Sequence, residues 1–541
     1  HTGTPLVVLS PLGSSMDDWD PAITNGLARK QKVILFDNQG VGLSTGKTPD
    51  SIAAMASGAV SFIKALGHTK VNLMGFSMGG FISQQIALTE PALVNKIILT
   101  GTGPKGSVGL GDLPKILASA TSDNPSPEEL FLRFGFTQSE ASRRAGKAAY
   151  QRVNARVIDR DKPVSNESVS AGVAAVLGWA QANPNALAEL KLMTQPTLII
   201  QGQKDVPVPV INAINLSQNI PNARLVLFPD AAHAALFQFP AQFVQHVLDF
   251  LDPAAAEAVL PAGEHHQKAA TQFVEAGDTK YAYRILGDKT GIPLVILSPL
   301  GSSMDDWDPA ITNGLASKHK VILFDNQGIG STNGTTPATI AGMASGAVSF
   351  IKALGLSKVN LMGFSMGGFI SQQIALTEPA LVNKIILTGA GPKGSVGLAD
   401  LPKNVAALLG ANLSPEELFL RSGFTDSDDS RRAGKAAYQR IQTRTVDRDK
   451  PATGEAVTAG VMAVVGWAQP SPDALKELGT LSQPTLIFHG QKDAPVPVVN
   501  AINLSQSIPH ARLVLMADAA HAVSFQFPAQ FVQSALDFLN E

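Results

Sequence analysis

A serine lies at the centre of the most informative short motif of the chain. Gly75-Phe76-Ser77-Met78-Gly79 joins a predicted strand to a predicted helix. A serine on such a tight turn projects its hydroxyl from the sheet edge, and the flanking glycines remove side chains that would collide. The N-terminus of the following helix directs backbone N–H groups at a negative charge developing on oxygen. The pattern predicts a nucleophilic serine at position 77.

The stretch around this serine occurs twice. Residues 71–100 recur letter for letter at 359–388, and the same offset of 288 residues relates 1–252 to 289–540 without an insertion or deletion. Ser365 therefore repeats Ser77. A repeat of this length is a complete domain rather than a solenoid unit. The chain is predicted to contain two near-copies of one enzyme-sized domain.

A serine hydroxyl at its normal pKa is a poor nucleophile and needs a neighbouring base. The chain has 10 histidines, and only His233 and His521 are related to each other by the repeat offset. His233 follows the last predicted strand of its copy, in a loop. These two histidines are the predicted bases.

The third member of such a site is a carboxylate that orients the imidazole. Asp205 follows a predicted strand, and Asp493 occupies the same place in the second copy. Asp230 is the alternative, because it lies three residues before His233. Its place in the same short loop is more typical of a turn-forming residue, so Asp205 and Asp493 are favoured.

Short apolar runs in each copy are typical of strands buried on both faces of a parallel sheet. They alternate with helical stretches, which predicts a doubly wound, mostly parallel α/β sheet. Between Gly103 and Gln195 the pattern is helical only. It predicts a helical cap at about 104–190, and at about 392–478 in the second copy. The runs of the first copy are 5–10, 32–37, 70–75, 96–101, 196–202 and 223–229.

The predicted domains are 1–252 and 269–541, joined by an Ala/Pro-rich linker at 253–268. His265 and His266 fall within this linker, and we expect them to be solvated rather than to act as ligands. We also expect that the two copies can pack as an intramolecular pseudo-dimer.

The second copy includes a segment, 271–291, that alternates like two short strands around an Ala-Gly-Asp turn. His1 aligns with Lys289, so the first copy as given is expected to lack this edge hairpin.

Composition excludes several classes of function. Net charge is −2, with 45% hydrophobic and 16% charged residues, as in an ordinary soluble globular protein. Lysine and arginine are nowhere concentrated enough to favour nucleic acid or a membrane surface as a partner. The absence of cysteine excludes disulfides, thiolate zinc sites and a cysteine nucleophile. The compartment is undetermined by the sequence, with the cytoplasm favoured.

In the order and spacing of these motifs, each copy resembles the α/β-hydrolase superfamily over nearly its whole length. GFSMGG is similar to the nucleophile elbow of esterase, enol-lactonase and cofactor-free haloperoxidase-like members, GQKDxPVP to the acid loop, and the AAH segment to the histidine loop. DNQGVG at 37–42 resembles an Asp-x-Arg-Gly-x-Gly turn, with Gln39 where arginine is common. The resemblance implies two α/β-hydrolase domains without a metal or organic cofactor, with the triads Ser77, Asp205, His233 and Ser365, Asp493, His521.

The resemblance also implies an oxyanion hole. The family usually has His-Gly after its third strand, whereas this chain has Ser10-Pro11-Leu12-Gly13. Pro11 has no N–H, so the N–H groups of Leu12 and Met78 are the expected donors. Leu300 and Met366 are their counterparts in the second copy.

Two charged segments are assigned structural roles. MDDWDP at 16–21 places three carboxylates close together, as a cation site could. Helix capping is the favoured role for them. The segment from Arg444 to Lys450 has charges of both signs and is expected on the solvated surface of the cap.

These inferences predict a tandem serine hydrolase with a carboxylic ester or lactone as its small-molecule substrate. The alternatives are perhydrolysis with halide oxidation, hydrolysis of a carbon–carbon bond on the same triad, and a receptor-like binder with slow turnover.

Overall fold

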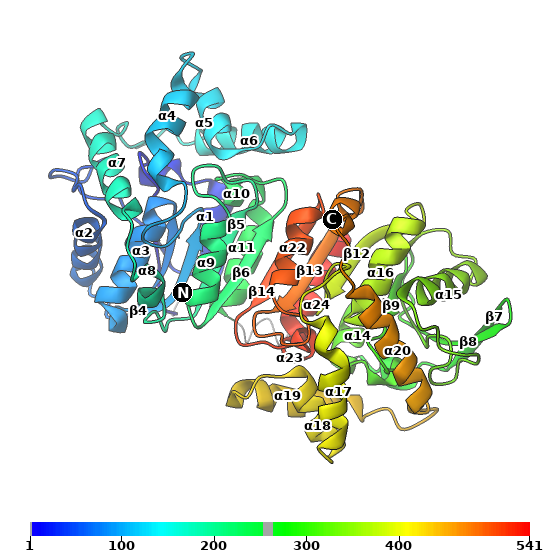
Figure 1. Ribbon diagram of the computed structural model, residues 1–541. Coiled ribbons are helices and arrows are strands. Elements are labelled where there is room, and N and C mark those ends of the chain that lie inside the picture. Colours follow the sequence, from blue (N-terminus) through cyan, green and yellow to red (C-terminus); the bar gives the residue numbers. More distant parts are fainter. Residues whose placement is uncertain (1–2, 253–262) are drawn as a thin grey trace. The chain divides into compact units, whose positions relative to one another are not determined.

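The computed structural model describes residues 3–252 and 263–541, and the chain divides into two compact units, His1–Asp252 and Pro253–Glu541. Residues 253–262 of the predicted linker lie outside the described residues. Figure 1 shows the first unit in blue to green and the second in green to red. Within the described ranges, no helix is both long and apolar enough to cross a membrane.

The first unit is built on a parallel sheet of six strands in the order β2-β1-β3-β4-β5-β6. The predicted doubly wound α/β fold is confirmed, and each of the six predicted runs overlaps a strand. β3, β5 and β6 are buried along their whole length, as expected for strands covered on both faces. The strands are β1 Leu6–Leu9, β2 Val33–Leu35, β3 Val71–Phe76, β4 Val94–Thr100, β5 Thr197–Gly202 and β6 Ala223–Phe228.

Helices join these strands. Because crossovers between parallel strands are right-handed, the path outward from β1 to β2 and the return to β3 put α1 and α2 on opposite faces of the sheet. α1 packs against α11, and α2 against α3. The helices are α1 Pro21–Ala28, α2 Ile52–Ala65, α3 Met78–Thr89, α4 Leu113–Thr121, α5 Pro127–Gly135, α6 Glu140–Val153, α7 Asn166–Ala180, α8 Ala186–Leu190, α9 Ile211–Asn219, α10 Ala235–Gln238 and α11 Pro240–Leu251.

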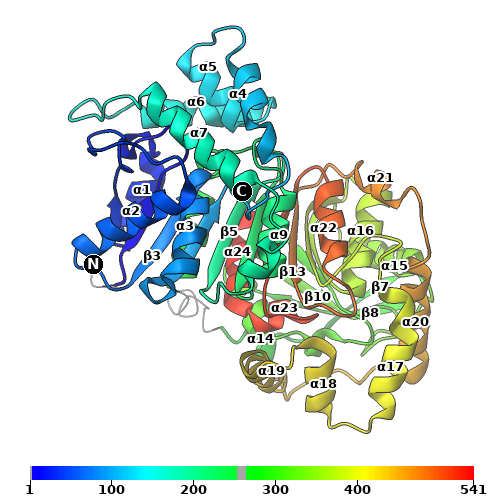
Figure 2. The same ribbon diagram turned by 60° about the vertical axis from the view of Figure 1, so that its left-hand side comes forward.

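The predicted helical cap comprises α4 to α8. Figures 1 and 2 both show α4, α5 and α6 grouped beyond one end of the strands. Serines start three of the cap helices: the hydroxyls of Ser126, Ser139 and Ser165 accept the backbone N–H three residues later. Each cap satisfies a donor that the first turn leaves unpaired, so the sequence divides the insertion into short helices.

The second unit has the same parallel core and an added hairpin, in the order β14-β13-β12-β11-β9-β10-β8-β7. β7 and β8 pair antiparallel with each other, and β8 also pairs antiparallel with β10. The strands are β7 Gln272–Ala276, β8 Thr279–Leu286, β9 Leu294–Leu297, β10 Val321–Phe324, β11 Val359–Phe364, β12 Val382–Thr388, β13 Thr485–Gly490 and β14 Ala511–Met516.

The helices of the second unit repeat those of the first and include an extra short helix before the hairpin. They are α13 His265–Lys268, α14 Pro309–Ala316, α15 Ile340–Ala353, α16 Met366–Thr377, α17 Leu401–Gly410, α18 Pro415–Gly423, α19 Asp428–Ile441, α20 Gly454–Trp467, α21 Ala474–Leu478, α22 Val499–Ser507, α23 Val523–Gln526 and α24 Pro528–Asn540.

Two expectations of solvent exposure are wrong in part in the second unit. His265 is exposed as expected, but His266 is buried, and its backbone N–H donates to Asn313 at 2.8 Å. In the segment from Arg444 to Lys450 most residues are exposed, but Arg444 is buried and the side chain of Asp449 is only 1% exposed. The cause is Arg284 on β8, whose guanidinium pairs with Asp305 at 2.6 Å and with Asp449 at 3.2 Å. The hairpin therefore places the guanidinium of Arg284 beside the carboxylates of Asp305 and Asp449, for which the sequence alone indicates no partner.

The MDDWDP segments act as helix caps. Ser15 and Asp18 form a reciprocal capping box at the start of a short 3-10 helix, Met16–Asp18. Asp20 then accepts the N–H of Ala22 at the start of α1 and pairs with Arg152 of α6 at 2.6 Å. The carboxylates thus anchor the cap to the sheet domain.

Candidate active site

Ser77 lies on the turn between β3 and α3. Its backbone has φ 54° and ψ −118°, a strained conformation for a residue with a Cβ. A Cβ at Gly75 would lie 2.2 Å from the carbonyl oxygen of Gly79, and one at Gly79 would lie 2.0 Å from that of Leu9. Close packing of α3 on the strands therefore requires both glycines, and it holds the serine at the carboxyl end of β3.

This position is a topological switch point. β1 and β3 are neighbours, but the chain leaves β1 toward β2 and leaves β3 toward β4. In open α/β sheets the crevice outside the strand ends at such a reversal is where ligands bind. Leu12 follows β1 and Ser77 follows β3, so both border this crevice.

The structure brings the three predicted residues of the first unit together. His233 Nε2 lies 3.0 Å from Ser77 Oγ, and His233 Nδ1 lies 2.9 Å from Asp205 Oδ2. With a proton on Nδ1 donated to the carboxylate, Nε2 is left as the acceptor for the serine hydroxyl. Asp205 and His233 are both buried, which strengthens this chain of hydrogen bonds.

Asp230, the alternative acid, has other partners. Its carboxylate accepts hydrogen bonds from Thr137 at 3.0 Å and from Ser139 at 2.5 Å, and it pairs with Lys204 at 3.0 Å. These contacts hold the pKa of Asp230 below its ordinary value even though burial acts to raise it. Asp230 thus joins the cap to the loop after β5 instead of orienting the imidazole.

The second unit places its predicted residues in a similar arrangement. Ser365 has φ 53° and ψ −118°, and His521 Nδ1 lies 2.9 Å from Asp493 Oδ2. Burial acts to raise the pKa of Asp493, but the charge and hydrogen bond of His521 outweigh it and hold that pKa below its ordinary value. Within residues 263–541, no hydrogen bond joins His521 Nε2 to Ser365 Oγ.

The predicted oxyanion donors lie at the same crevice. Met78 and Met366 are the first residues of α3 and α16, so their N–H groups have no acceptor inside the helix. Leu12 and Leu300 line the cavities that contain the serines. The starts of α3 and α16 thus leave the N–H groups of Met78 and Met366 beside the serines without an acceptor in their own helix.

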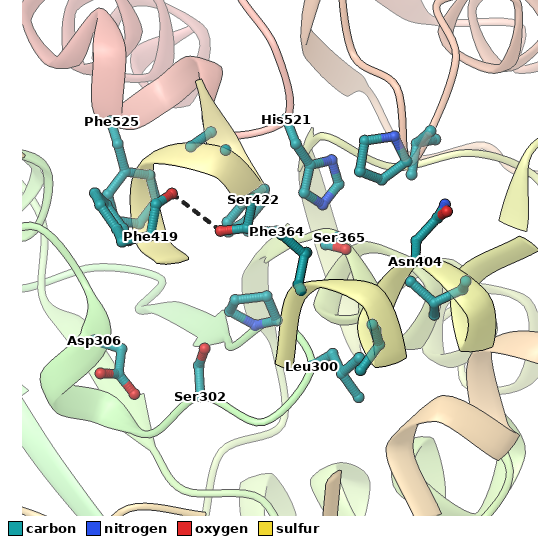
Figure 3. Close-up of a pocket in the computed structure, with 18 of the residues that line it drawn as sticks. Leu300, Ser302, Asp306, Phe364, Ser365, Asn404, Phe419, Ser422, His521 and Phe525 are labelled. Atoms are coloured by element: carbon teal, nitrogen blue, oxygen red, sulfur yellow. Dashed lines mark hydrogen bonds between the residues drawn. The ribbon is translucent and has the colours of Figure 1, made fainter. Parts of the chain in front are cut away.

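A cavity lies above each serine, between the sheet and the cap. The first has a volume of about 500 Å³ and the second of about 330 Å³. Figure 3 shows Ser365 and His521 beside the second cavity, with Leu300, Asn404 and Ser422 among the residues around it. Apolar side chains, chiefly leucine, valine and phenylalanine, make up most of both walls, which favours an apolar group on a bound molecule.

Two further positions border the site and were not among the predicted residues. Gln201 donates to Asp205 Oδ2 at 2.6 Å, and its counterpart His489 lies 3.4 Å from Asp493 Oδ2. Phe134 packs its ring edge-on against His233 at 5.5 Å. Both positions differ between the two copies, which is the signal in the sequence that could have found them.

Comparison with known proteins agrees with the architecture of both halves. The family model described as alpha/beta hydrolase fold matches residues 4–240 and 292–528. The chain belongs to this family. The resemblance seen in the sequence motifs is thereby confirmed, and the protein is a duplicated α/β hydrolase.

Individual relatives match one half of the chain. An alpha/beta hydrolase fold protein of known structure from Chitinophaga pinensis is 38% identical, with a TM-score of 0.50 over 51% of this chain and 99% of the other. A putative carbamate hydrolase, RutD, from Rhizobium rhizogenes is 30% identical over 46% of this chain and 92% of its own length. A pimeloyl-[acyl-carrier protein] methyl ester esterase from Nitrosomonas europaea is 27% identical over 45% and 93%.

Proposed function

We propose that each unit is a serine hydrolase that cleaves a carboxylic ester or lactone through an acyl-enzyme. The observation that carries the proposal is the hydrogen-bond chain from Ser77 through His233 to Asp205, on a strained turn that faces an apolar cavity. The names of the relatives support it, since a carbamate and a methyl ester are both attacked at an acyl carbonyl.

In the proposed reaction, Ser77 Oγ attacks the carbonyl carbon while His233 Nε2 takes the hydroxyl proton. Asp205 accepts the Nδ1–H bond throughout and stabilises the imidazolium. The oxyanion receives hydrogen bonds from the N–H groups of Leu12 and Met78. His233 then gives its proton to the leaving alcohol, and water activated by the same histidine releases the acid.

Ser365, His521 and Asp493 carry out the same steps in the second unit, with Leu300 and Met366 as donors. The apolar walls favour an acyl group with a hydrocarbon portion. The absence of a hydrogen bond between His521 and Ser365 among the described residues does not argue against the role, because catalytic hydrogen bonds are often poorly formed until substrate binds.

Hydrolysis of p-nitrophenyl acetate and butyrate by four forms of the full chain tests the proposal. Ser77→Ala and Ser365→Ala should each retain part of the activity. The double variant should lose it, by about 10⁶ in kcat for each nucleophile removed. Activity that survives in the double variant would rule out both serines as nucleophiles.

A further inference from the structure

The two triads differ in the contacts of the histidine. His233 Nδ1 also lies 3.1 Å from Asp205 Oδ1, whereas among the described residues His521 Nδ1 is bonded only to Oδ2 of Asp493. In the first unit His233 Nε2 lies within hydrogen-bond distance of Ser77 Oγ, at 3.0 Å. Among the described residues of the second unit the corresponding bond is absent, although the bond from histidine to aspartate is 2.9 Å in both. Some residue near the histidine must account for this difference.

The framework of the site does not account for it. The two serines have the same backbone conformation, with φ of 54° and 53° and ψ of −118° in both. The phenylalanine before each serine packs on the histidine alike, with ring centroids 5.1 Å apart for Phe76–His233 and 5.0 Å for Phe364–His521. The turn and this ring therefore impose the same geometry on both histidines.

The side chain at the end of the second cap helix does differ. Phe134, on α5, presents its ring edge-on to His233 with an interplanar angle of 89°. Its counterpart Ser422, on α18, turns its hydroxyl back to the carbonyl oxygen of Phe419 at 3.0 Å, the dashed line in Figure 3. The imidazole side chain is 4% exposed at His233 and 14% exposed at His521. The histidine that lacks the edge-on ring is thus the more exposed of the two.

We propose that Phe134 is a positioning residue of the first site, whose ring covers His233 and holds the imidazole on Ser77, and that Ser422 leaves His521 uncovered. A packed ring removes alternative rotamers of the histidine. It also excludes water that competes for Nε2, which strengthens the bond to the serine hydroxyl. An effect of Phe134 on kcat rests on the proposed hydrolase function, whereas the covering of the imidazole by the ring does not.

His489 offers a competing explanation. It replaces Gln201 beside the acid, and its Nε2 lies 2.8 Å from the carbonyl oxygen of Val496 and 3.4 Å from Asp493 Oδ2. If this histidine drew the carboxylate away, then His489→Gln rather than Ser422→Phe would change the behaviour of His521. The two explanations therefore predict opposite results for two single substitutions in the same unit.

Chemical modification with diethyl pyrocarbonate measures the covering without requiring turnover. The reagent acylates an accessible unprotonated imidazole nitrogen. Peptides containing His233 and His521 differ in sequence, so mass spectrometry follows both in the full chain. We expect His521 to react faster than His233 in the unaltered protein. Phe134→Ser should raise the His233 rate several-fold, Phe134→Leu should raise it less, and Ser422→Phe should lower the His521 rate toward that of His233.

Each histidine serves as the internal control for substitutions made in the other unit. An unchanged His521 rate in a folded Ser422→Phe variant would overturn the proposal. So would protection of His521 by His489→Gln instead. Since Ser422→Phe is expected to add protection, loss of folding cannot imitate the predicted result.

Ester hydrolysis supplies the kinetic readout. In the Ser365→Ala background, Phe134→Ser should lower kcat by about tenfold while KM changes less, because a general base acts only when it is in hydrogen-bond reach of the proton. Phe134→Leu should restore most of kcat. In the Ser77→Ala background, Ser422→Phe should raise kcat. If neither single-serine background hydrolyses ester, the proposed function fails, and the modification rates still decide the role of Phe134.

Discussion

The two units carry the same proposed catalytic residues in different surroundings. Residues 71–100 and 359–388 are identical, and the turns that hold Ser77 and Ser365 have the same dihedral angles. The differences lie outside this shared stretch, in the cap and in the acid loop. The shared turn sets the position of each serine, whereas in our proposal residues of the cap and the acid loop determine how the histidine is held and how large the cavity is.

The largest expected effect is that of the acid. Asp205→Asn in the Ser365→Ala background should lower kcat by about 10⁴, because an amide cannot hold the imidazole in the required tautomer. Asp493→Asn in the Ser77→Ala background should have an effect of the same order. Asp230→Asn is the matched control, since Asp230 binds Thr137, Ser139 and Lys204. A greater loss from Asp230→Asn than from Asp205→Asn would reverse the assignment.

The second comparison concerns Arg284 and its carboxylates. Arg284 and Asp305 have side chains only 1% and 2% exposed. Removing one partner of a buried pair costs about 3–5 kcal/mol, so Arg284→Ala should strongly destabilise the second unit. The surface pair of Lys352 and Glu378, 55% and 39% exposed, provides the control, because such pairs contribute about 0–1 kcal/mol. Urea unfolding monitors both variants, and equal losses would contradict the account.

The cavities predict a smaller difference in substrate preference. Site one, with about 500 Å³, should accept longer acyl chains than site two, with about 330 Å³. Differences of this kind alter discrimination by about 1–3 kcal/mol. Values of kcat/KM for acetate, butyrate and octanoate esters, measured in the two single-serine variants, provide the check. Profiles that coincide across chain length would show that the cavity walls do not select the substrate.

The smallest effect is a pH dependence of stability. Burial raises the pKa of Asp449 to about 6, although Arg284 acts to lower it. A carboxyl whose pKa is raised by folding stabilises the native state fully below its unfolded value, and this contribution is lost as the pH rises through the folded value. Stability should therefore decline between about pH 4 and pH 6, and Asp449→Asn should flatten the decline. Melting temperatures across this range test it, and a steeper decline in the variant would contradict the prediction.

Much of the fold could be predicted because its signals are local. Continuous apolar runs predicted all six strands of the first unit, and the flanking glycines predicted the turn around Ser77. The charged network of the second unit was not, since Arg284 meets Asp449 across more than 150 residues of chain. The contact of Phe134 with His233 also joins distant segments. In both cases the contact joins residues far apart in the sequence. No local sequence pattern indicates such a contact, so the partner is known only from the packing of the folded chain.

We propose that one chain holds two competent nucleophilic serines. A fluorophosphonate that bonds covalently to an activated serine tests it by the mass of the intact protein. The unaltered chain should gain two adducts, Ser77→Ala and Ser365→Ala one each, and the double variant none. A single adduct on the unaltered chain would show that one unit is silent, and an adduct on the double variant would contradict the assignment of both serines.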